Sequence, residues 1–192
     1  KYLLFFLVFI SISSCSDIIH DNEITKETKL IKLSTNMGDI TIELFKEKAP
    51  ETVANFLKYT NDGKFNGTIF HRVIPNFMIQ GGGHLPDMSQ IVSYDPIINE
   101  SDNDLSNKKG TIAMARTSSP NSATSQFFIN LRDNEFLDRS NASDGYGYCV
   151  FGQVTDGIEI VEQIGAVATG NNAGHSDVPL ESITITEVTV IE

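Results

Sequence analysis

Short segments in which apolar and polar residues alternate, with turn-forming residues between them, constrain the fold of this chain most strongly. Residues 31–34 and 40–44 alternate in this way, and the intervening residues 36–39, Asn-Met-Gly-Asp, favour a turn. Similar short segments follow, separated by Gly, Pro, Asn and Asp, and few of them are separated by a helix. Parallel strands need long crossover connections, and this pattern provides few of them. The pattern therefore predicts a small, mostly antiparallel β-barrel or sandwich.

Two segments have the apolar spacing of helices. The first begins at Pro50, a residue favoured at the first helical position, and ends before residues 61–63, Asn-Asp-Gly. The second is predicted over residues 157–164, with Asp156 as its N-terminal cap and Gly165 as its terminator. The first helix is expected to pack its apolar face against the sheet.

The C-terminal segment changes phase once. Ile183 and Ile185 follow one alternation, whereas Val188 and Val190 follow the other. A β-bulge near Thr186 and Glu187 would absorb this slip, and bulges are common where a strand of a barrel has to bend. We therefore predict a final strand with a bulge.

Size and charge limit the range of functions. A chain of 192 residues is long enough for one domain and a short additional segment. The formal net charge of −11 argues against nucleic acid as a partner, because phosphate binding depends on clustered Lys and Arg side chains, and the sequence has no basic run. The acidity is expected to keep the domain soluble, and a monomer is the default.

The N-terminal residues have the pattern of an export signal. Residues 2–12 form an almost unbroken apolar run, which is too short for the roughly 20 residues of a membrane-spanning helix. Residues 12–15, Ile-Ser-Ser-Cys, resemble the lipoprotein box, in which the cysteine is acylated and becomes the new N-terminus. Acylation of Cys15 would attach the chain to a membrane, on the periplasmic or cell-surface side after export. Ordinary cleavage of the signal peptide, with Cys15 incidental, stays open as the alternative.

These features divide the chain into three parts. They are a lipoprotein-type signal peptide over residues 1–15, a polar and flexible tether over residues 16–28, and a folded domain over residues 29–192. The second cysteine, Cys149, lies in an apolar segment of that domain and is expected to be a buried free thiol. No disulfide is therefore predicted.

Two long motifs carry a resemblance to a known family. Residues 70–82 read FHRVIPNFMIQGG, and residues 110–129 read GTIAMARTSSPNSATSQFFI. Both are similar to motifs of the cyclophilin-type peptidyl-prolyl cis/trans isomerases, in the same order, and the resemblance extends over about residues 29–192. The chain looks like the exported bacterial branch of that family. The resemblance implies a mainly β fold, a closed eight-stranded antiparallel barrel with two flanking α-helices.

The resemblance also implies which residues act. At matching motif positions, Arg72 is the catalytic arginine, and Gln80 orients its guanidinium or holds the substrate carbonyl. Phe136 stands where the best-known eukaryotic members carry Trp, and Tyr148 stands where they carry His. The backbone of Arg116 is expected to matter more than its side chain. The implied substrate-binding residues are Phe77, Met78, Ala115, Arg116, Gln126, Phe128, Phe136, Leu137 and Tyr148.

The implied reaction explains these residue types. An X-Pro amide resists rotation by roughly 18–20 kcal/mol, because the nitrogen lone pair is delocalised into the carbonyl. As the amide twists, its nitrogen can accept a hydrogen bond from a guanidinium, and this bond is available only near the transition state. No covalent bond is made or broken, so no nucleophile, metal or cofactor is expected. The implied partners are proline-containing polypeptides, and the implied role is to assist the folding of exported proteins.

Other functions are compatible with parts of the sequence. A proline-peptide-binding or holdase chaperone module, with incidental isomerase activity, is the alternative function, although Arg72, Phe77, Gln80 and Phe128 argue against it. A barrel that holds a small ligand, as in the lipocalins, is disfavoured because the many large apolar residues predict a filled interior.

The histidines are not expected to take part in the reaction. His71 precedes Arg72, but the reaction moves no proton, so His71 is expected to be a structural hydrogen-bonding residue. His20, His84 and His175 lack the spacing of metal ligands, so no metal site is predicted.

Overall fold

The structure is a computed structural model, and it describes residues 29–191. The predicted signal peptide, the tether and Cys15 lie outside the described residues. Within residues 29–191, no helix is both long enough and apolar enough to cross a membrane.

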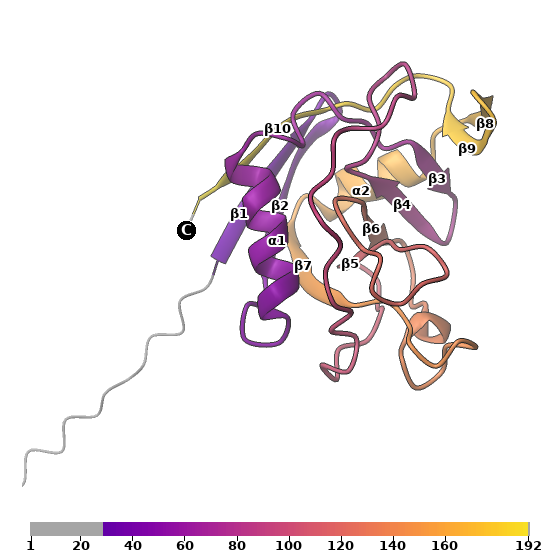
Figure 1. Cartoon of the computed structure of the whole chain (residues 1–192). Coiled ribbons are helices and arrows are strands. Elements are labelled where there is room, and N and C mark those ends of the chain that lie inside the picture. The colour runs from indigo at the N-terminus through magenta and orange to yellow at the C-terminus, as the bar shows by residue number, and fades with distance from the viewer. Residues whose placement is uncertain (1–28, 192) are drawn as a thin grey trace, which may run out of the picture.

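Eight strands form one antiparallel sheet, which curls strongly around the interior of the domain (Figure 1). Their order across the sheet is β10-β1-β2-β7-β5-β6-β4-β3. A mainly β fold with two α-helices is confirmed. In chain order the strands are β1 (Lys29–Thr35), β2 (Gly38–Leu44), β3 (Arg72–Ile74), β4 (Met78–Gly81), β5 (Thr111–Met114), β6 (Phe127–Asn130), β7 (Val150–Asp156) and β10 (Ile185–Val190).

The predicted closure of the barrel is wrong. The end strands of the sheet, β10 and β3, do not pair with each other. The segment that precedes β3 instead meets the first residue of β10 and the segment before it. Gly67 N–H donates to the Ile185 carbonyl (2.8 Å), and Phe70 N–H donates to the Ile183 carbonyl (2.9 Å). This contact does not continue into a ladder between β3 and β10, so the sheet is an open half-barrel.

The predicted hairpin and the predicted bulge are confirmed. β1 and β2 pair along their whole length. β1 also pairs with β10, where Ser34 opposes Glu187 but the next residue, Thr35, opposes Ile185. Thr186 is thus the additional residue of a bulge, at the position where the hydrophobic phase slips.

The first helix, α1 (Pro50–Asn61), begins at the predicted proline and buries one face in the core. Its Phe56 ring packs against the rings of Phe127 from β6 and Phe151 from β7, with centroids 5.6 Å and 5.3 Å apart. Large side chains therefore fill the interior, as predicted. Cys149 is part of the same core and is a free, buried thiol, as predicted.

The second helix, α2 (Ile158–Gly165), begins differently from the prediction. Asp156 is the last residue of β7 and does not cap the helix, because Gly157 is the N-cap residue. Gly157 has φ +80°, and a Cβ atom there would lie 2.3 Å from the Asp39 carbonyl oxygen. This close approach of two backbone segments requires glycine.

A separate hairpin consists of β8 (Thr169–Asn172) and β9 (His175–Pro179). It projects at the end of the domain where β3 lies (Figure 1). The hairpin brings β9, which is near the C-terminal end of the sequence, next to the strand that carries Arg72.

Candidate functional site

All but two of the predicted catalytic and substrate-binding residues line one pocket of about 200 Å³, which we call the cleft. The two others lie beside it. Gln126 is hydrogen-bonded to Gln80, and the half-exposed Phe136 stacks on Phe77 with ring centroids 5.8 Å apart. The residues that line the cleft are Arg72, Phe77, Met78, Gln80, Ala115, Arg116, Phe128, Leu137 and Tyr148.

Strand pairing places three of these side chains in one row. Arg72 on β3 lies directly opposite Gln80 on β4, and Gln80 lies directly opposite Phe128 on β6. Opposite residues of an antiparallel pair point to the same face of the sheet, so these three side chains form one wall of the cleft, the strand wall. Gln80 is itself held, since its Nε2 donates to Oε1 of Gln126 at 2.9 Å.

Arg72 has a partner that the sequence did not indicate. Its Nε lies 3.7 Å from Oδ2 of Asp177 on β9, and the two side chains are 43% and 41% exposed. At this distance and exposure an ion pair contributes little, so the guanidinium stays available to a substrate. No local pattern could have revealed the pair, because the two residues are far apart along the chain.

The opposite wall of the cleft, the loop wall, contains Leu137 and Tyr148. Leu137 is in the short helix η1 (Glu135–Leu137), and its carbonyl accepts a hydrogen bond from Tyr148 N–H at 2.9 Å. The Tyr148 ring meets the Phe128 ring of the strand wall edge-on, with centroids 5.7 Å apart. The two walls thus contact each other through apolar surface.

Asp138 fixes the first part of the loop wall. Its carboxylate accepts hydrogen bonds from Ser106 Oγ (2.5 Å), Asn107 N–H (2.7 Å) and Asn107 Nδ2 (2.9 Å). Asn107 is fully buried, so these bonds satisfy groups that water does not reach. The segment that carries Leu137 is therefore anchored by the next residue along the chain.

Arg116 fixes the second part of the loop wall. Its side chain is only 3% exposed, and its Cζ lies 4.5 Å from the centroid of the Tyr148 ring. It donates from Nε to the Gly147 carbonyl (2.9 Å) and from Nη2 to Asp144. Its side chain is thus engaged with its own protein, and the expected contact of its backbone with a peptide stays a prediction.

Asp144 completes this network and was not predicted. Its carboxylate accepts hydrogen bonds from Tyr146 N–H (2.9 Å), Gly147 N–H (3.1 Å) and the Arg116 guanidinium. These bonds, that of Tyr146 first and that of Arg116 second, lower the pKa of Asp144 to about 2. The carboxylate stays charged at neutral pH and holds the turn before Tyr148 in place.

Comparison with known proteins identifies the family of the chain. The model of one family, described as cyclophilin type peptidyl-prolyl cis-trans isomerase/CLD, matches residues 30–190. The chain belongs to the cyclophilin family. The resemblance of its two long motifs is thereby confirmed.

Individual cyclophilins support the same assignment. Peptidyl-prolyl cis-trans isomerase B of Escherichia coli (strain K12) is 55% identical over 164 residues, which cover 85% of this chain and 100% of that protein. The isomerase cyp18 of Streptomyces antibioticus is 51% identical and covers 84% of this chain and 98% of its own length. A crystal structure of a cyclophilin type isomerase from Cryptosporidium parvum superimposes with a TM-score of 0.67 at 27% identity, over 86% of this chain and 98% of that chain. This cyclophilin is a peptidyl-prolyl cis–trans isomerase.

Three histidines of this cyclophilin lie together, although their spacing in the sequence gave no sign of it. The ring centroids of His71 and His84 are 4.2 Å apart, and those of His84 and His175 are 5.2 Å apart. Burial, followed by the charges of His84 and His175, lowers the pKa of His71 to about 3, so this ring is neutral. Its Nδ1 has no hydrogen-bond partner, so the expected structural hydrogen bond can involve only the other ring nitrogen.

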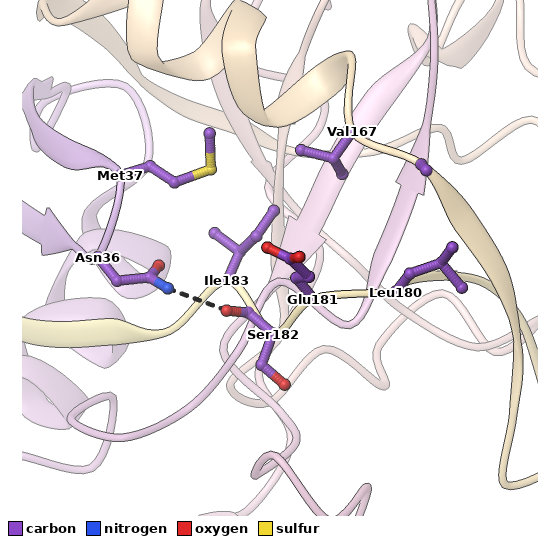
Figure 2. A pocket seen from close by; sticks show the side chains of 8 residues that line it. Asn36, Met37, Val167, Leu180, Glu181, Ser182 and Ile183 are labelled. Carbon is purple, nitrogen blue, oxygen red and sulfur yellow. Dashed lines mark hydrogen bonds between the residues drawn. The ribbon is translucent and has the colours of Figure 1, made fainter.

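A larger hollow, of about 530 Å³, shares no residue with the cleft of this cyclophilin. Figure 2 shows Asn36, whose amide donates a hydrogen bond to the Ser182 carbonyl. Met37 lies on the same side of this hollow as Asn36, and Val167 and Leu180 lie on the other side. These side chains offer no cation that could act on an amide nitrogen. Size alone therefore does not identify the site.

Proposed function

We propose that Arg72 is the catalytic residue of this isomerase and that the apolar residues of the cleft hold the proline ring of the substrate. The observation that carries the proposal is the row on the strand wall, where a half-exposed guanidinium lies beside Gln80 and the buried ring of Phe128. A proline ring against Phe128 would bring its amide nitrogen within the range of Arg72.

The chemistry then follows from differential binding. The planar amide has no free lone pair on nitrogen, whereas the twisted amide has one. A guanidinium next to the nitrogen therefore binds the twisted form more strongly, which lowers the rotational barrier. Gln80, held by Gln126, would support the guanidinium or the substrate carbonyl.

The apolar part of the cleft anchors the substrate. Met78 and Phe128 are 2% and 4% exposed, and Leu137 and Tyr148 face them from the loop wall. Burial of a proline ring among such side chains contributes on the order of 1.5–3 kcal/mol. This contribution depends little on the flanking residues, so the enzyme should accept X-Pro bonds in many flexible chains.

Substitution of Arg72 tests the proposal. Arg72→Ala should lower kcat/KM for a proline tetrapeptide by about a hundredfold, the usual cost of removing one transition-state donor. The assay is protease-coupled or NMR-detected isomerisation, with circular dichroism to verify the fold. The matched control is Arg132→Ala, which removes an arginine that is bonded to Asn134 and does not line the cleft. Unchanged turnover of Arg72→Ala would remove Arg72 from the mechanism.

The same variant separates the isomerase from a binding module. Refolding of a proline-limited client should be accelerated by the wild type and hardly at all by Arg72→Ala. Equal acceleration by both proteins would show that binding, rather than isomerisation, assists the client.

We further propose that the enzyme is exported, is attached to a membrane through an acylated Cys15, and assists the folding of exported proteins as a monomer. The support comes from the sequence, since an apolar run ends in a cysteine motif before residue 30, where the family match begins. Intact-mass analysis of protein from native membranes should show a chain that starts at an acylated Cys15. A Cys15→Ala variant should leave the membrane fraction. An unmodified, freely released chain would contradict the anchor.

A further inference from the structure

A second hollow, of about 430 Å³, adjoins the cleft and shares Arg72 and Gln80 with it. One side is formed by β3 and β4, and the other by the β8–β9 hairpin. We call it the histidine hollow. Its lining consists of His71, Arg72, Gln80, His84, Gln90, Gln126, Gly174, His175, Ser176 and Asp177.

Two buried histidines line this hollow with unused hydrogen-bonding atoms. His71 and His84 are 4% and 3% exposed. Nδ1 of His71 and both ring nitrogens of His84 have no partner in the protein. A buried polar atom without a partner costs about 1–3 kcal/mol, so such atoms in a native protein call for an explanation. Because both residues line the hollow, a group that enters the hollow is the candidate partner of these nitrogens.

The position of His84 is set by the backbone. Its carbonyl accepts a hydrogen bond from Ile69 N–H at 2.9 Å, and the residue forms an isolated β-bridge with Gln90. The ring also packs between the rings of His71 and His175. The unpartnered nitrogens are thus held in place before any ligand arrives.

The charges around the hollow indicate which ligand it suits. Arg72 and Asp177 lie 3.7 Å apart, so a charged ligand group of either sign meets one attractive and one repulsive charge, and the pair favours neither sign. Within residues 29–191, no three His, Cys, Asp or Glu side chains are arranged to hold a metal ion. A neutral imidazole has one donor and one acceptor, which matches an uncharged group that can both accept and donate.

We propose that the histidine hollow is a subsite for an uncharged hydrogen-bonding side chain, Asn, Gln, Ser or Thr, located within two residues of the substrate proline. An extended chain advances about 3.3–3.6 Å per residue, so a neighbour of a proline bound in the cleft reaches a hollow that shares two residues with it. The inference rests on the proposed placement of the proline ring. Such a subsite would make the enzyme selective among proline sites, although the cleft itself recognises little besides the proline ring.

Paired peptides test the subsite. Each peptide contains a single proline. One of the four positions within two residues of that proline is occupied in turn by Gln, Leu, Glu or Lys, and exchange NMR gives kcat/KM for each peptide. At one position at least, the Gln peptide should exceed the Leu peptide at least fivefold, and the Glu and Lys peptides should stay below the Gln peptide. Equal values for Gln and Leu at every position would overturn the proposal and would mean that the hollow holds only water.

Variants of the hollow make the test specific. His84→Phe keeps the ring but removes its nitrogens, and it should bring the Gln-to-Leu ratio to within twofold of one. Ser182→Ala, in the other hollow, is the matched control and should keep the wild-type ratio. If His84→Phe does not fold, His175→Ala at an exposed position should lower the ratio at least twofold. A ratio unchanged in these His variants would also overturn the proposal.

The outcomes separate this inference from the proposed function. If the enzyme catalyses the Gln and Leu peptides equally, the subsite fails while the cleft keeps its role. If Arg72→Ala retains full activity on both peptides, the proposed placement of the proline ring is contradicted, and the subsite that rests on it is contradicted as well.

Discussion

The strand wall and the loop wall face each other across one cleft, but they are held in place by different interactions. Arg72, Gln80 and Phe128 lie on neighbouring strands, where the backbone ladder sets their register. Leu137 and Tyr148 lie in segments outside the sheet and depend on the carboxylates of Asp138 and Asp144.

This difference in anchoring predicts which wall of the cleft a substitution can disturb. Backbone hydrogen bonds of a ladder survive most side-chain substitutions, because every residue except proline supplies them. A segment anchored by one carboxylate loses several bonds when that side chain is removed. Single substitutions away from the substrate should therefore disturb the loop wall much more than the strand wall.

The largest effect is expected for the anchor of η1. Asp138→Ala should lower the free energy of unfolding by about 3 kcal/mol, because three hydrogen bonds are lost and the buried backbone N–H of Asn107 keeps no partner. Urea denaturation measures this loss. The control is Asp133→Ala, which removes a single bond to the exposed Lys109 N–H and should cost clearly less. Equal losses would contradict the role given to Asp138.

The strand wall should respond to pH through the buried residue next to Arg72. The pKa of His71 is about 3 in the folded protein and 6.5 in the unfolded chain. Between these values the unfolded chain binds more protons, so stability is lost as the pH falls below 6.5. The loss from this group at pH 5 is about 2 kcal/mol.

The measurement is the free energy of unfolding at pH 7.5 and at pH 5. The wild type should lose about 2 kcal/mol more than His71→Asn, since other groups contribute alike to both proteins. The groups that face this ring are Arg72, His84 and His175. His175→Asn, at an exposed position, should nearly keep the wild-type loss, because burial of His71 is the first cause of its shift. Identical losses for wild type and His71→Asn would refute the assignment.

The smallest effect is expected for the second anchor of the loop wall. Asp144→Asn removes the ion pair with Arg116 but keeps an acceptor oxygen for the backbone, so KM should rise about threefold with a smaller change in kcat. Steady-state isomerisation kinetics separate the two constants. Glu162→Gln breaks the exposed Lys109–Glu162 pair (2.6 Å), which does not line the cleft, and should leave both constants unchanged. A fall in kcat alone would mean that Asp144 acts on the reaction and not on the wall.

Local patterns predicted the elements that depend on neighbours along the chain. The hairpin of β1 and β2, the bulge at Thr186 and the start of α1 at Pro50 were all predicted from the alternation of side chains and from turn and cap residues. The start of α2 was predicted wrongly. Its N-cap has to be Gly157 because the backbone of Asp39, which is distant in sequence, packs against it.

The candidate site divides in the same way. The two motifs contain seven of the nine residues that line the cleft, and the wider resemblance to the family indicated the other two, Leu137 and Tyr148. Asp144 and Asp177 were missed, because the residues around a carboxylate in a polar loop or hairpin do not indicate which distant side chain it will contact. Closure of the sheet was mispredicted for a related reason, since pairing of β3 with β10 depends on how strands far apart along the chain lie in space.

Residue types in a fixed order along the chain were enough to predict the family, the reaction and the antiparallel strands. The tertiary structure alone decided that three distant histidines share one hollow and that Asp177 lies beside Arg72. Burial and charge pairing depend on distances in space, which arise only when the hairpin of β8 and β9 packs beside β3.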